Sequence, residues 1–71
     1  MLLSWLKDHR FYNVQLQANL FGGISIVCSW GSIDNKLGSY KIIFCNTELE
    51  VENTLQTIKK RRKANGYILT D

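Results

Sequence analysis

Two runs of alternating apolar and polar residues, joined by a glycine turn, constrain the fold of this 71-residue chain more than any other feature. The first run, 11–17, and the second, 24–30, both place apolar side chains at even-numbered positions. A period of two is typical of a strand with one buried and one solvent-exposed face. Gly22 and Gly23 lie between the runs, where glycine can adopt the positive φ of a tight turn. The sequence therefore predicts a β-hairpin.

The chain continues with a loop and a third strand. Residues 31–39 are rich in Gly, Ser, Asp and Asn, which is typical of a loop. After this loop Tyr40, Ile42 and Phe44 recur at every second position. We expect these three side chains to be the inward-facing set of the third strand.

A helix is predicted after the third strand, because the apolar period lengthens from two residues to three or four. Thr47 is the expected N-cap, and Glu50 is expected to accept a hydrogen bond from the backbone amide of that cap. Gly66 is a natural C′ residue and ends the helix. The expected core stripe of the helix consists of Val51, Leu55, Ile58 and Arg62. These elements predict an α+β fold, in which a small antiparallel sheet of three to four strands packs its even-numbered face against one helix in the C-terminal half.

Length and composition limit the chain to one small domain. Residues 11–71 are expected to form it, and residues 1–10 to be an apolar N-terminal segment that packs on it. This segment is too short to span a membrane and lacks the basic region of a signal peptide, so we expect a cytoplasmic protein without a membrane partner. Cys28 and Cys45 are too few for a disulfide scaffold and are expected to be free thiols.

The sequence predicts no catalytic, metal or cofactor site. The single histidine, His9, has only the adjacent Asp8 beside it, and neighbours in sequence do not make a positioned catalytic pair. Two cysteines leave half of a zinc coordination shell empty. The Gly22-Gly23 pair is followed by neither a phosphate-binding lysine nor a helix. We therefore expect a protein that is not an enzyme.

A basic run occupies the expected end of the helix. It holds five of the nine cationic residues, namely Lys59, Lys60, Arg61, Arg62 and Lys63. One interpretation is a solvated helix terminus that interacts favourably with the helix dipole. The other is a phosphate-binding patch with sequence-independent affinity for nucleic acid. Lys36 in the loop and Lys41, expected on the outward side of the third strand, could extend such a patch.

Trp30, at the end of the second strand, also has two interpretations. Its even-numbered position groups it with the inward-facing residues, which predicts a core aromatic. An aromatic residue beside a glycine at a strand end can also keep one edge of its ring accessible. Gly31 would then let a ligand come close to the backbone.

Several short motifs follow one another in order along the chain. They are the strand from Tyr12 to Leu16, Leu20-Phe21-Gly22-Gly23, Trp30-Gly31 with Ile33, Gly38, and the basic approach to Gly66-Tyr67. In this order and spacing they resemble the WGR domain, a small module best known beside the catalytic domain of poly(ADP-ribose) polymerases and also found in short bacterial proteins. The resemblance covers roughly residues 11–67.

The resemblance implies a DNA contact, because in better-studied WGR domains this tryptophan packs against the sugar-phosphate backbone near a DNA break. Two positions depart from the family pattern. Ser32 replaces the usual arginine, so a fixed charge and a forked donor are lost. Asp34 replaces a second glycine and adds a negative charge.

Two functions follow from these observations. The leading hypothesis is a non-catalytic DNA or other nucleic-acid-binding module. Its predicted contacts with the sugar-phosphate backbone are Trp30, Gly31, Lys36, Lys59, Lys60, Arg61 and Lys63. The alternative is a protein–protein interaction module that keeps the fold without binding DNA. Its partner would bind the N-terminal apolar segment together with Val27 and Ile43, both expected on the outward face of the sheet.

Overall fold

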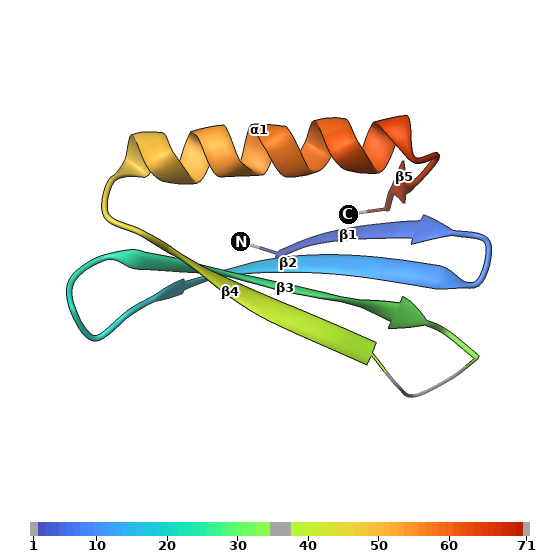
Figure 1. Cartoon of the computed structure of the whole chain (residues 1–71), viewed down its shortest axis with the longest axis horizontal. Helices are drawn as coiled ribbons and strands as arrows, with labels where there is room; N and C mark the ends of the chain where they lie inside the picture. Colours follow the sequence, from blue (N-terminus) through green and yellow to red (C-terminus); the bar gives the residue numbers. More distant parts are fainter. Residues whose placement is uncertain (1, 35–37, 71) are drawn as a thin grey trace.

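The chain folds into one antiparallel sheet with a single helix laid across one of its faces (Figure 1). The computed structural model describes residues 2–34 and 38–70. In chain order the elements are β1 (Leu2–Lys7), β2 (Arg10–Ala18), β3 (Ile24–Ser32), β4 (Gly38–Cys45), α1 (Glu48–Ala64) and β5 (Ile68–Leu69). The strand order is β4-β3-β2-β1-β5. The predicted α+β class is confirmed, with five strands in place of three to four.

The N-terminal segment is an integral strand of the sheet. β1 pairs with β2 on one side and with β5 on the other, so that it lies inside the sheet. Trp5 is opposite Tyr12 and is only 3% exposed, which makes it part of the core. Leu2 and Leu6 point to the opposite face and are exposed. Trp5 and the half-buried Leu3 are therefore used within the fold.

The core lies between the helix and the sheet. Its buried members are Trp5, Tyr12, Val14, Ile26, Cys28, Cys45, Val51 and Ile58. Every strand from β1 to β4 contributes to this set, and α1 contributes two residues on one helical stripe, with Leu55 packed between them. Both cysteines are free thiols, as predicted.

The predicted orientation of the third strand is wrong. In β4 the inward-facing residues are Ile43 and Cys45, whereas Tyr40, Ile42 and Phe44 are exposed. The register explains the difference, because Ile43 pairs with the buried Ile26 and directly opposed residues share a face of the sheet. Apolar residues occupy both parities of this strand, so its alternation alone could not choose a face. The same shift moves Ile43 off the outward face.

The loop after β3 is shorter than predicted. β3 continues through Trp30 and Gly31 to Ser32, and β4 already begins at Gly38. Gly31 and Gly38 are cross-strand partners. A Cβ atom on Gly38 would lie 2.9 Å from the carbonyl oxygen of Trp30, so a side chain there would push the strands apart. The glycines thus extend the hairpin where composition suggested a loop.

The helix has a defined cap at each end. The Glu50 amide donates to Thr47 Oγ1 at 3.2 Å, which confirms the N-cap. The Glu50 carboxylate accepts from the amide of Asn46 at 3.1 Å, one residue before the position predicted for that bond. At the other end Gly66 has φ +85°, and the Tyr67 amide donates to the Arg62 carbonyl at 2.9 Å. This turn reverses the chain and brings Tyr67 back to the core. Within the described chain no helix is long and apolar enough to cross a membrane.

Candidate nucleic-acid interface

A groove opens between α1 and the part of the sheet near β4. Its deeper section has a volume of about 210 Å³, and a shallower section of about 200 Å³ continues it toward the end of β3. The lining residues are Tyr12, Trp30, Lys41, Ile43, Thr54, Thr57, Ile58, Arg61 and Arg62. We call this surface the cationic groove, because three of its residues are basic and none of those described is acidic.

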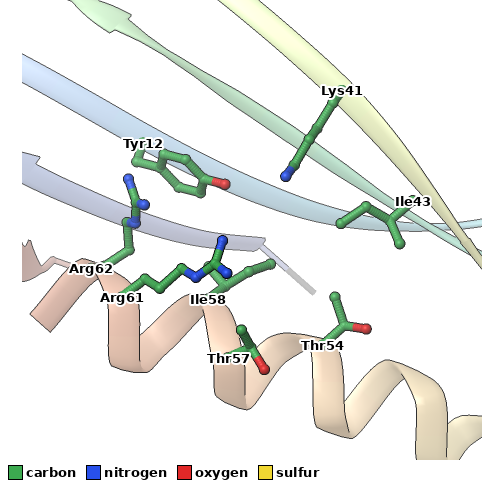
Figure 2. A pocket seen from close by; sticks show the side chains of 8 residues that line it. All are labelled: Tyr12, Lys41, Ile43, Thr54, Thr57, Ile58, Arg61 and Arg62. Atoms are coloured by element: carbon green, nitrogen blue, oxygen red, sulfur yellow. The ribbon is translucent and has the colours of Figure 1, made fainter. Parts of the chain in front are cut away.

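Basic side chains enter the groove from both of its walls. Figure 2 shows Lys41 pointing from β4 toward the helix and Arg61 pointing from α1 toward the sheet. The outward orientation predicted for Lys41 is therefore wrong. Lys41 pairs with Cys28, a buried residue of the helix-facing side. It faces α1 because of the same register that turns Ile43 inward.

Two stacked aromatic rings form the floor at the shallow end of the groove. The Trp30 and Tyr12 rings are 5.8 Å apart between centroids, with an interplanar angle of 14°. Trp5 and Tyr67 each pack edge-on against Tyr12, at 6.1 and 6.5 Å. Trp30 itself is only half-buried and lines the groove. Its ring is thus held from one side by the core and accessible from another, which combines both interpretations of this residue.

Arg62 is the basic residue closest to this aromatic cluster. Its guanidinium carbon lies 4.1 Å from the centre of the Tyr12 ring and 5.1 Å from that of Tyr67. Its Nε atom is buried and has no hydrogen-bond partner among the described residues. The sequence pattern places Arg62 in the core stripe of the helix, and the predicted phosphate-binding set omits it. The signal that could have identified it is its helical spacing from Ile58, which aims a cation at the sheet.

Helical geometry divides the rest of the basic run. At about 100° per residue, Arg61 falls on the same flank as Thr54 and Thr57, beside the groove. Lys59 and Lys63 fall on the other flank, and Lys60 points away from the sheet. None of these three lysines lines the groove, and all three are exposed. Of the other predicted contacts, Gly31 lies in β3 beside Trp30, and Lys36 lies outside the described residues.

The hydroxyl of Tyr12 stays protonated well above neutral pH. Burial in the core raises its pKa from 10.0 to about 12, and a hydrogen bond with the Cys28 side chain adds to this effect. The nearby charges of Arg62 and Arg61 act in the opposite direction but are weaker. Tyr12 therefore presents a neutral hydroxyl to the cationic groove.

A second hollow lies at the end of the sheet, beyond the Trp30 ring. It has a volume of about 390 Å³ and is lined by Lys7, Asp8, His9, Arg10 and Ser32. Arg10 is the cross-strand partner of both Lys7 and Ser32. Close by, His9 Nδ1 lies 3.3 Å from a carboxylate oxygen of Asp34. The serine at the motif position of the usual arginine thus has an arginine directly opposite it.

No metal centre is formed by the part of the chain that the structure describes. No three His, Cys, Asp or Glu side chains come together there as a ligand set. His9, the single histidine, is exposed and pairs with Asp34 outside the cationic groove. What the groove offers to a ligand is therefore positive charge, hydroxyl donors and an aromatic surface.

Comparison with known families agrees with this arrangement. The family model of the WGR domain matches residues 5–71, which is nearly the whole chain and includes the second half of β1. Neither the curated proteins nor the solved structures yield a match. The sequence motif Trp30-Gly31 lies near the end of β3 beside the groove, and the matched region contains β2, β3, β4 and the helix that form it. This chain belongs to the WGR domain family.

Proposed function

We propose that this protein is a non-catalytic nucleic-acid-binding module that holds the sugar-phosphate backbone of DNA in the cationic groove. WGR domains are a family of nucleic-acid-binding modules. The observation that carries the proposal for this chain is the composition of the groove. Lys41, Arg61 and Arg62 converge on it from two elements, and no described carboxylate lines it.

The chemistry of the groove suits phosphates better than bases. Arginine donates forked hydrogen bonds to phosphate oxygens, and lysine adds a compact positive charge. Thr54 brings a hydroxyl donor to the same wall, whereas Thr57 Oγ1 donates to the Asn53 carbonyl at 3.0 Å. Trp30 offers an aromatic surface to a sugar or a base at the shallow end. Because backbone contacts carry no sequence information, we expect binding with little preference among sequences.

The test is a titration of nicked, blunt-ended and single-stranded oligonucleotides, followed by fluorescence anisotropy at several salt concentrations. The three groove cations are expected to contribute about −2.7 to the slope of log K against log salt on duplex DNA. The double variant Lys41→Ala/Arg61→Ala removes two groove cations and is expected to lower the affinity strongly. The matched control, Lys59→Ala/Lys60→Ala, removes the same charge outside the groove and is expected to have a much smaller effect.

Two results would contradict the proposal. Equal losses of DNA affinity in the two double variants would mean that net charge alone, and not the groove, attracts DNA. The absence of binding by the wild type even at low salt would exclude a nucleic-acid-binding function for this domain. Trp30→Ala supplies an independent variant, since it removes the aromatic surface without changing the charge.

One observation favours a second candidate function, self-association through β4. This edge strand exposes a row of apolar side chains on the face away from the helix, with Tyr40 72%, Ile42 45% and Phe44 69% exposed. An unpaired edge can pair with another strand, and antiparallel pairing of two β4 strands about Ile42 would place Tyr40 opposite Phe44 of the second copy.

The charge distribution also suits an antiparallel pair of copies. β4 runs from the end of the molecule that carries the basic helix terminus to the end where the acidic first turns of α1 begin. Two antiparallel copies therefore bring opposite charges together. Analytical ultracentrifugation tests this candidate: wild type should dimerise and Ile42→Lys should be a folded monomer. A wild type that stays monomeric at high concentration would exclude it.

A further inference from the structure

Three residues form a row at the end of the sheet. Lys7 on β1, Arg10 on β2 and Ser32 on β3 are successive cross-strand partners, so their side chains share one face of the sheet. Two residues further along the same strands, Tyr12 pairs with Trp30 on this same face. We call Lys7, Arg10 and Ser32 the terminal row. It lies on the helix-facing side, like the cationic groove.

The aromatic pair therefore has basic groups on both sides of it. Two residues of strand span about 7 Å, so the terminal row lies about that far beyond the Tyr12–Trp30 pair. On the other side of the pair, Lys41 stands opposite Cys28, two residues before Trp30. Going along the strands, the face thus presents Lys41 with Arg61, then the stacked rings with Arg62 over Tyr12, then Arg10 with Lys7.

The basic residues of the terminal row are available to a ligand. Arg10 is exposed, and neither it nor Lys7 makes an ion pair with any residue that the structure describes. Lys7 lies with its Nζ atom 5.9 Å from the centre of the Tyr67 ring, which keeps it beside the aromatic cluster. Asp8 also lines the hollow and reduces its positive potential. The other nearby carboxylate, Asp34, lies 3.3 Å from His9 Nδ1.

Ser32 shapes this site by its small size. WGR domains usually have an arginine at this position, and Ser32 leaves a hollow there that Arg10 lines from the neighbouring strand. The arginine thus stands on the strand next to the motif position, about 5 Å away along the backbone pairing. Ser32 adds a hydroxyl donor beside it.

We propose that Arg10 and Lys7 form a second phosphate subsite of the domain, in which Arg10 supplies from β2 the forked donor that is missing at Ser32. This inference rests on the proposed function. The ligand is a backbone phosphate of the same nucleic-acid strand whose other phosphates lie in the cationic groove, with Trp30 contacting the sugars or bases between them.

The experiment measures duplex DNA binding by anisotropy between about 50 and 200 mM salt. Arg10→Ala is expected to weaken binding roughly tenfold and to make the salt slope shallower by about 0.9. Arg10→Gln, which keeps the side-chain stem but not the charge, should lose as much DNA affinity as Arg10→Ala. Lys60→Ala, which removes one charge on the far side of the helix, should stay within about twofold of wild type. The double variant Arg10→Ala/Ser32→Arg returns a guanidinium to the neighbouring strand and should recover both the affinity and the slope.

The outcomes separate the subsite from the proposed function. If wild type binds and Arg10→Ala behaves like Lys60→Ala, the second subsite is wrong while DNA binding through the groove stands. The second subsite is equally wrong if Arg10→Ala/Ser32→Arg, with an unchanged melting temperature, binds no better than Arg10→Ala. If wild type itself does not bind DNA at low salt, the proposed function fails, and the subsite fails with it.

Discussion

The guanidinium of Arg62 lies 4.1 Å from the centre of the Tyr12 ring, and Tyr12 in turn stacks on Trp30 at 5.8 Å. A residue of the basic helix end and the tryptophan of the family motif are thus joined through one buried tyrosine. Because the same three side chains line the groove, changes made there to alter binding will also alter stability. Binding and unfolding must therefore be measured separately for each groove variant.

Replacing Arg62 is expected to destabilise the fold as well as to remove charge. Arg62→Ala loses a partly desolvated cation–π contact and the packing of the side-chain stem, which predicts a loss of about 1–2 kcal/mol in the free energy of unfolding. Arg62→Met keeps most of the stem and should recover part of this loss. The exposed Lys60→Ala should change stability by less than about 0.5 kcal/mol. Urea unfolding measures all three, and equal midpoints for Arg62→Ala and Lys60→Ala would contradict the prediction.

Tyr12 predicts a loss of stability at alkaline pH. Its pKa is about 12 in the folded protein and 10.0 ordinarily, so between these values the unfolded chain releases a proton that the folded chain still holds. The contribution of the protonated Tyr12 hydroxyl to the free energy of unfolding is therefore fully present below pH 10. It is lost as the pH rises toward 12, by about 2–3 kcal/mol in total. The measurement is urea unfolding of wild type and Tyr12→Phe from about pH 8 to 12. The difference in free energy of unfolding between wild type and Tyr12→Phe should change only above pH 10. A constant difference would show that Tyr12 does not titrate in this way.

Adjacent isoleucines of β4 should differ in their sensitivity to substitution. Ile43 packs against the core, so Ile43→Ser is expected to cost about 1–3 kcal/mol through lost burial and an unpaired hydroxyl. Ile42 faces away from the helix and is 45% exposed, so Ile42→Ser should cost much less. Thermal unfolding at low protein concentration keeps any self-association out of the comparison. A larger effect at Ile42 would mean that the strand faces the other way.

The C-terminal cap of the helix depends on glycine at position 66. Gly66 has φ +85°, where a Cβ atom is strained. Gly66→Ala should therefore destabilise by about 1 kcal/mol. Gly66→Asn should cost less, because asparagine tolerates the left-handed conformation better. Denaturant midpoints that are the same for both variants would contradict this order.

The elements with strong local signals were predicted correctly. The hairpin of β2 and β3 follows from clean alternation around two glycines, and the helix follows from its capping threonine, its apolar stripe and Gly66. Trp30 could be placed at a strand end on the inward side from its parity alone. These features depend on residues only a few positions apart, where backbone sterics and side-chain periodicity act directly.

The sequence by itself therefore determined the fold class, the family and the position of the basic run at the end of the helix. Only the tertiary structure decided which cations meet the aromatic pair. Lys41 reaches the groove because β4 pairs with β3 in a register that turns odd-numbered residues toward the helix, and a shift of one residue would have turned it away. Arg10 stands opposite Ser32 for the same kind of reason, since strand pairing joins residues that are far apart in the chain. Such register is decided by the burial of the whole core, and no local stretch of sequence contains that information.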